Sequence, residues 1–199
     1  MSLVQSIERA KDLGIWLHEK TNNKKRTGGL RERTGESILQ HSLDLSDAIL
    51  VLIEACLPGP AMTLARPLFE SYVRGFWLLR FASDQEIAKF NNGAGPKFAH
   101  LLKAIGNDVE SGAAWIHANE KANWIAFNDL THGGSEHVRR RSTQELVEPN
   151  YPEAELESLV RFGIEIRLRV GSDFLSLMGD DITKKQLTEK ANIIRSHLE

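Results

Sequence analysis

Three charged residues stand four positions apart in a strongly apolar segment: Arg66, Glu70 and Arg74. This spacing places them on one face of a helix, where one carboxylate can pair with both guanidinium groups. The surrounding residues are mostly apolar or aromatic, so we expect neighbouring helices to enclose this helix. Buried ions are costly without partners, and the two arginines therefore require an anion besides Glu70. That anion is either another protein carboxylate, which makes an internal salt bridge, or a phosphate or carboxylate ligand.

A histidine and two glycines follow at a predicted turn, in the sequence LTHGG. Gly133 and Gly134 suit the left-handed residue that closes helices, and they permit a ligand to approach the backbone closely. Histidine changes its charge near neutral pH and serves as a general acid or base. At the end of a helix it can equally cap free carbonyl groups. His132 is therefore the candidate catalytic residue, on condition that the turn folds back onto the charged face formed by Arg66, Glu70 and Arg74, which we call the arginine stripe.

His41 is a further candidate for ligand binding, because Glu36 and Asp44 lie within two helical turns of it. The chain has no HExxH motif or similar pair of ligands on one helical face, so we predict neither a metal site nor a cofactor. It also has no P-loop, dinucleotide fingerprint or GxSxG elbow. The basic stretch 20–33 and the triple arginine 139–141 could contact a nucleic-acid backbone, although such runs are commonly solvated loops.

Apolar residues recur with a period near 3.6 along almost the whole chain, and no segment alternates as a strand does. This pattern predicts an all-α fold, an antiparallel bundle of about six or seven helices in a single domain over residues 1–199. Pro67 predicts that the helix over 58–82 either is kinked near Thr63 or has a regular part that begins close to Pro67. The expected helices of the bundle are 3–20, 36–57, 58–82, 97–105, 113–130, 152–178 and 183–197, with a further short helix over 85–90.

The same pattern assigns residues to the core or to the surface. Cys56 and the four tryptophans are expected in the core, because they stand among apolar residues at helical spacing. The second half of the helix 36–57 is apolar nearly all round and is expected to be buried. Charges of alternating sign every fourth residue predict a solvated ladder on the helix 152–178. Its members are Glu157, Arg161, Glu165, Arg169 and Asp173.

Composition narrows the class of protein. The chain has 199 residues, is 41% hydrophobic and carries a net charge of −2, which excludes a disordered chain. A single cysteine excludes a disulfide framework and a cysteine zinc site. The start does not read as a signal peptide, and the longest apolar stretch, AILVLIEACL, is too short to span a membrane. We expect a cytoplasmic protein that has no membrane contact and forms a homodimer through an apolar helix face.

Two long segments and one short motif carry a resemblance to a known family. The run LPGPAMTLARPLFESYVRGFWL, preceded by SILQHSLDLSDAILVLIEAC and followed by LTHGG, resembles an uncharacterised family of bacterial all-helical domains of unknown function. In that family an arginine, a glutamate four residues later and a downstream histidine turn recur on a helical bundle. The resemblance spans most of residues 36–140.

Such bundles are similar in outline to the HEPN class of small helical domains, many of which bind nucleotides or cleave RNA in toxin–antitoxin and phage-defence systems. The HEPN ribonuclease signature places a histidine shortly after an arginine on one helix. This chain departs from it, because seven residues separate Arg33 from His41 and no histidine closely follows Arg66 or Arg74.

Three functions remain open at this point. The first is a binding module in which Arg66, Glu70 and Arg74 hold an anionic ligand such as a nucleotide or an RNA phosphate. The second is a ribonuclease-like toxin or defence enzyme in which His132 transfers protons. The third is a structural or protein-interaction bundle whose charged stripe is an internal salt bridge.

Overall fold

The computed structural model of the chain describes residues 2–22, 28–106, 112–143 and 145–196. Helices account for most of these residues, which contain no strand, only one isolated bridge between Ser142 and Val147. The fold is therefore all-α, as the periodicity predicts. Across the same ranges, no helix is both long enough and apolar enough to cross a membrane.

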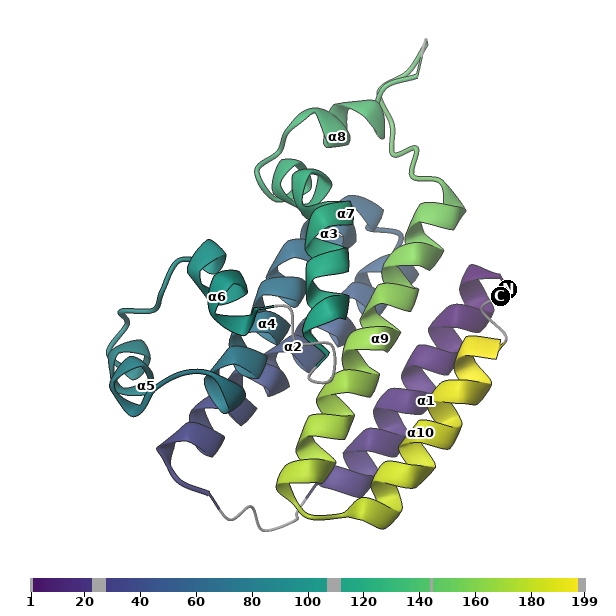
Figure 1. Cartoon of the computed structure of the whole chain (residues 1–199). Coiled ribbons are helices and arrows are strands. Elements are labelled where there is room, and N and C mark those ends of the chain that lie inside the picture. The colour runs from purple at the N-terminus through teal and green to yellow at the C-terminus, as the bar shows by residue number, and fades with distance from the viewer. Residues whose placement is uncertain (1, 23–27, 107–111, 144, 197–199) are drawn as a thin grey trace.

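Figure 1 shows the arrangement of the helices. α1, α9 and α10 lie side by side on one flank, α2 and α4 form the centre, α5 and α6 lie on the other flank, and α8 stands at one end. The helices are α1 (Leu3–Thr21), α2 (Leu30–Glu54), α3 (Pro58–Thr63), α4 (Ala65–Arg80), α5 (Asp84–Asn91), α6 (Phe98–Ile105), α7 (Ala113–Thr131), α8 (Ser135–Arg139), α9 (Glu153–Leu177) and α10 (Asp181–Ser196).

Two glycines allow α2 and α4 to pack closely at the centre of the molecule. A Cβ atom at Gly35 would lie 2.5 Å from Cγ of Leu79, and one at Gly75 would lie 2.6 Å from Cδ2 of Leu39. Atoms at these distances would overlap, so only glycine permits this separation of the two helices. The close packing holds α4, which carries the charged stripe, against the core.

The helices are more numerous than the six or seven expected. The helix expected over 58–82 is divided into α3 and α4, because Pro67 has no N–H to donate to the carbonyl group of Thr63. α8 was not expected, since its five residues are too few to show a period. α2 begins earlier than expected, at Leu30, where the Glu32 side chain accepts a 2.7 Å hydrogen bond from the N–H of Gly29.

Two expectations concern residues that the structure does not describe. The centre of the basic stretch, residues 23–27, lies outside the described residues, and so does the expected end of the last helix at His197. Of that stretch, Arg31 is described, and its guanidinium group bonds the carbonyl oxygen of Leu78 at 3.2 Å and Oδ1 of Asp84 at 2.7 Å.

Several assignments to core and surface were wrong. Cys56 is exposed, because α2 ends before it and its backbone has a φ of 57°. Val51 and Leu57 are also exposed, so the second half of α2 is not buried all round. Among the tryptophans, Trp77 is buried as expected, whereas the other three are only half-buried.

The ladder on α9 is not a solvated face. None of its five members is exposed, and Asp173 is buried and paired with Arg80. Arg169 lies over the ring of Trp115, with its guanidinium carbon 4.2 Å from the ring centroid. Glu157 and Arg161 pair along the helix, whereas Glu165 pairs with Arg195 of α10, so the alternation of charge showed neither which residues would pair nor that other helices cover these side chains.

Candidate functional site

The side chains of Arg66, Glu70 and Arg74 lie on one face of α4, as their spacing predicts. Their exposed fractions are 22%, 19% and 26% respectively. The stripe is therefore partly covered by neighbouring helices but remains in contact with solvent. Because it is not sealed, a ligand can reach it without unfolding the bundle.

One carboxylate serves both arginines. Nε of Arg66 donates to Oε1 of Glu70 at 2.7 Å, and Nη2 of Arg74 donates to Oε2 at 3.4 Å. Nη1 of Arg74 also donates to the carbonyl oxygen of Pro96 at 3.4 Å. Within the described ranges, no other acidic side chain pairs with either arginine. The stripe therefore carries an uncompensated positive charge.

The histidine turn folds back onto this stripe. Nη1 of Arg66 and Nε2 of His132 are 2.7 Å apart, although 66 residues separate them in sequence. A guanidinium group can only donate hydrogen bonds, so Nε2 of His132 is the acceptor and the proton of the neutral ring is on Nδ1. The turn therefore folds back onto the arginine stripe, as a role of His132 there requires. The His132 side chain is exposed at this point.

An aromatic ring that the sequence analysis did not assign to the site also holds Arg66. The guanidinium carbon of Arg66 lies 5.0 Å from the centroid of the Trp124 ring, and Trp124 in turn stacks on Phe98 with the centroids 4.6 Å apart. Cation–π attraction adds to the bonds from Glu70 and His132. Arg66 is therefore held from three sides, whereas the hydrogen bonds of Arg74 to described residues are two, each 3.4 Å long.

The two glycines of the turn have structural roles. Gly133 adopts the left-handed conformation, with a φ of 71°, which confirms the expected helix-closing residue. At Gly134 a Cβ atom would lie 2.1 Å from Oδ1 of Asp129. That carboxylate accepts a 2.5 Å hydrogen bond from the N–H of Glu136 and so caps the start of α8. Gly134 thus makes room for a cap, and this explains its presence without a ligand.

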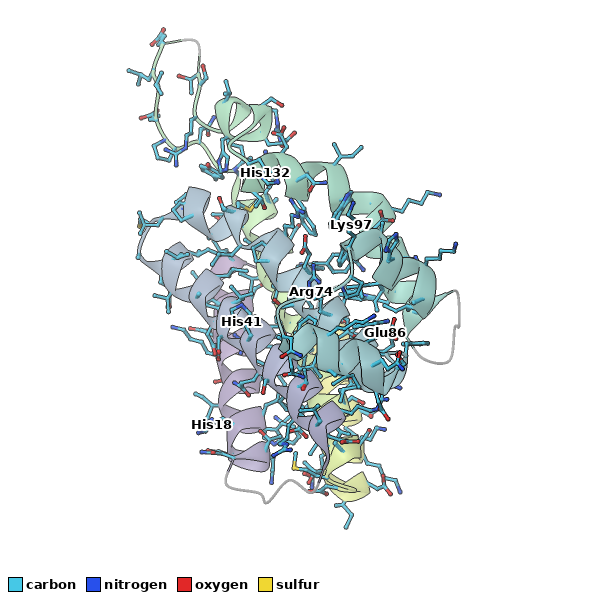
Figure 2. All side chains as sticks on the ribbon, turned by 90° about the vertical axis from the view of Figure 1, so that its left-hand side faces the viewer. His18, His41, Arg74, Glu86, Lys97 and His132 are labelled. Atoms are coloured by element: carbon cyan, nitrogen blue, oxygen red, sulfur yellow. The ribbon has the colours of Figure 1, made fainter. Side chains whose placement is uncertain are left out.

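Lys97 is a second residue that the sequence analysis missed. It directly follows Pro96, whose carbonyl oxygen bonds Arg74, and its side chain is exposed. Figure 2 shows Lys97, Arg74 and His132 on the same side of the molecule. The only signal that could have found Lys97 is its place at the N-cap of α6, where helix dipoles favour anions.

His41 does not join this group. It is exposed on α2, and within the described ranges no hydrogen bond, ion pair or ring contact links it to Arg66, Glu70 or Arg74. In the same ranges, no cluster of three or more histidine, cysteine or acidic side chains could hold a metal ion.

The triple arginine is engaged in internal contacts. Arg140 is buried, bonding Oε2 of Glu155 at 2.5 Å and also pairing with Glu136. Arg139 pairs with the same two glutamates, and Arg141 lies over the ring of Tyr151. Hydrogen bonds from Arg140 and then Arg139 lower the pKa of Glu136 below its ordinary value of 4.5. These arginines therefore hold α8 and the segment after it against α9.

Two further arginines form ion pairs between helices, each with one partner buried. Arg167 of α9 is 2% exposed, and it donates to Oγ of Ser46 at 3.0 Å and to Oδ1 of Asp47 at 2.6 Å. Arg80 of α4 pairs with the buried Asp173 of α9. Burial raises the pKa of Asp173, an effect that the charge of Arg80 partly offsets.

Comparison with known proteins identifies a family. The model of a family of unknown function, DUF6988, matches residues 39–197 of this chain, which is more than half of its length and includes the whole arginine stripe and the histidine turn. The match agrees with the expected membership of a family of unknown function. No curated protein and no solved structure matches the chain.

Proposed function

The chain belongs to the DUF6988 family of unknown function, and we propose that it binds a phosphate-bearing ligand, a nucleotide or an RNA phosphate, at Arg66 and Arg74. One observation carries this proposal: two arginines on a solvent-accessible helix face share a single carboxylate. An anionic ligand would neutralise the charge that Glu70 leaves uncompensated.

The geometry of Arg66 suits the binding of an oxyanion. Glu70 takes its Nε–H, His132 takes one N–H of Nη1, and the remaining N–H groups stay available in a plane. This planar fork matches two oxygens of a phosphate or carboxylate group. Because Trp124 and Glu70 already orient the guanidinium group, binding requires little further ordering of that side chain.

Arg74 and Lys97 supply the additional charge. The two hydrogen bonds of Arg74 are 3.4 Å long, so a charge-assisted bond to phosphate can replace either of them at small cost. Lys97 follows Pro96, the carbonyl partner of Arg74, and its exposed side chain adds a further positive charge on that side of the molecule. The terminal phosphate of a nucleotide carries more than one negative charge, and successive phosphodiester groups of RNA carry one each, so either is better matched to these three cations than a single carboxylate.

A titration of the whole chain tests this function. Inorganic phosphate, AMP, ATP and a short RNA would be titrated into the wild type, Arg74→Met and Arg195→Met, with calorimetry as the readout. Arg195 is a matched control, because it is a paired arginine on α10 that bonds Glu165. We expect affinity for the best of these ligands to fall about tenfold or more in Arg74→Met and to change less than about twofold in Arg195→Met. Equal affinity in all three proteins would overturn the proposal.

The ribonuclease alternative is supported by the position of His132. Its exposed ring contacts the arginine that would hold the phosphate, so it could exchange a proton with an RNA bound there. The experiment compares RNA cleavage by the wild type with that by His132→Ala. Cleavage that is lost in the variant while RNA binding persists would favour the enzyme, and intact RNA in both samples would favour the binding module.

The structural alternative makes the opposite prediction. If the stripe is only an internal salt bridge, none of the four ligands raises the melting temperature of the wild type. Arg66→Met would then keep or increase stability, since an apolar side chain of similar length replaces a partly buried ion.

A further inference from the structure

A cavity of about 610 Å³ opens between α7 and α9, away from the arginine stripe. α7 packs on α3, α4 and α8, whereas α9 packs chiefly on α1, α2 and α10. Where the two helices face the cavity, several of the lining side chains are small: Ala126 on α7, and Ala154 and Ser158 on α9. Because these side chains are too short to fill the space, the gap between the helices remains open.

Three aromatic rings form much of the wall. Trp115 and Phe162 are stacked with their centroids 5.9 Å apart, and Phe127 contacts Phe162 at 5.5 Å. All three are only half-buried, although rings that contact one another in a bundle are normally covered by further side chains. Their remaining surface gives the cavity an apolar aromatic lining.

The charges around the cavity are balanced, in contrast to those of the arginine stripe. Two basic and two acidic residues line it, and each is already paired. Arg140 bonds Glu155 at 2.5 Å, Arg161 bonds Glu157 at 2.6 Å, and Glu165 bonds Arg195 at 2.8 Å. An ionic ligand would have to compete with one of these pairs and would gain little. The balance therefore favours an uncharged ligand.

Two carboxamide groups add hydrogen-bonding capacity. Asn119 and Asn123 both line the cavity from α7, one helical turn apart. Nδ2 of Asn123 donates to Oδ1 of Asn119 over 3.4 Å, a length at which the bond can be exchanged for one to a ligand. A carboxamide both donates and accepts, so it can bond a neutral hydroxyl, carbonyl or ring nitrogen.

We propose that this cavity binds an uncharged, flat aromatic molecule with a hydrogen-bonding substituent, its rings against the exposed part of the aromatic wall and its substituent at the asparagines. The volume falls within the range of about 300 to 1,000 Å³ that small-molecule sites occupy. This inference does not depend on the anion site, because no residue of the stripe lines the cavity.

The test uses N-phenyl-1-naphthylamine, a neutral aromatic amine whose fluorescence rises in apolar surroundings. We expect saturable binding at one site per wild-type chain. Ala126→Trp would fill the cavity and lower the affinity at least about tenfold. Ile125→Trp is the matched control, because Ile125 is next to Ala126 on α7, is 85% exposed and lies outside the lining. The affinity of this variant should change less than about twofold. Circular dichroism and melting temperature would verify that both variants fold.

A second pair of variants covers the case in which Ala126→Trp does not fold. Ser158→Phe narrows the cavity from an exposed position on α9, and Ser176→Phe changes an exposed serine of the same helix outside the lining. Equal probe affinity in these two variants, or no saturable binding to the wild type, would overturn the proposal. So would a wild-type dimer in sedimentation that Ser158→Phe converts to a monomer, because a second copy would then occupy the cavity.

Discussion

The arginine stripe of α4 and the Arg167 contact of α9 use the same residue types in opposite ways. Arg167 is 2% exposed and bonds Ser46 and Asp47 across the interface with α2. Arg66 and Arg74 are about one quarter exposed and share Glu70 within their own helix. Arg167 has a carboxylate of its own, whereas the stripe has one for two arginines.

This difference separates an ion pair that holds the bundle together from a candidate site. A buried guanidinium group that bonds residues of a second helix joins the two helices and is screened from a ligand by the side chains that cover it. A partly exposed pair with surplus charge contributes less to stability and retains donors for an anion. Burial and charge balance thus indicate which arginine serves which purpose, although the residue type is the same.

Removing Asp47 should have the largest effect on stability. Asp47→Ala leaves the buried charge of Arg167 with Ser46 as its remaining described partner; because the side chain of Asp47 is itself 64% exposed, we expect a loss of about 1 to 3 kcal/mol, below that for a fully buried pair. Urea unfolding followed by circular dichroism measures the loss. Asp44→Ala, one turn earlier and exposed, is the matched control and should change the unfolding free energy by less than about 0.5 kcal/mol. Equal losses of unfolding free energy in the two variants would mean that the ion pair between Arg167 and Asp47 does not stabilise the fold.

Two carboxylates that pair with arginines should respond to pH in opposite directions. The pKa of Glu136 is lowered by Arg140 and Arg139, so its ionised form stabilises the fold above pH 4.5, and this contribution is lost as the pH falls through the lowered value. The pKa of Asp173 is raised by burial, so the fold loses stability as the pH rises from 3.8 through the raised value.

Urea unfolding at a series of pH values between about 3 and 7 would compare Glu136→Gln and Asp173→Asn with the wild type. The stability advantage of the wild type over Glu136→Gln should grow with pH. Its advantage over Asp173→Asn should shrink as the pH rises. If the two differences in unfolding free energy change in the same direction with pH, burial does not control the pKa of Asp173.

Removing the carboxylate of the stripe should have the smallest effect on stability. Glu70→Gln keeps the shape of the side chain and leaves two arginines that are partly solvated, so the unfolding free energy should fall by less than about 1 kcal/mol. Urea unfolding followed by circular dichroism measures this change. A loss as large as that of Asp47→Ala would place the stripe with the structural ion pairs and remove the contrast between the two regions.

Local features of the fold followed from the sequence. Helical periodicity placed Arg66, Glu70 and Arg74 on one face, Pro67 predicted the break near Thr63, and Gly133 has the left-handed backbone expected of it. Each of these depends on residues within one or two helical turns. The sequence therefore contained the information needed for them.

Burial of individual charges did not follow from the sequence. The ladder of α9 shows the same alternation whether it faces water or other helices, and only the packed bundle covers Asp173 and Arg169. The burial of Arg167 could not be predicted either, because no residue near it in the sequence marks it as buried. Its partners lie on α2, more than a hundred residues earlier.

By itself, then, the sequence determined an all-helical chain, the face that carries the stripe and the turn that carries His132. The tertiary structure alone decided that this turn meets Arg66, that Trp124 holds the guanidinium group and that a cavity opens between α7 and α9. The physical reason is that a helix is specified by hydrogen bonds and side chains a few residues apart, whereas these contacts depend on how distant helices pack.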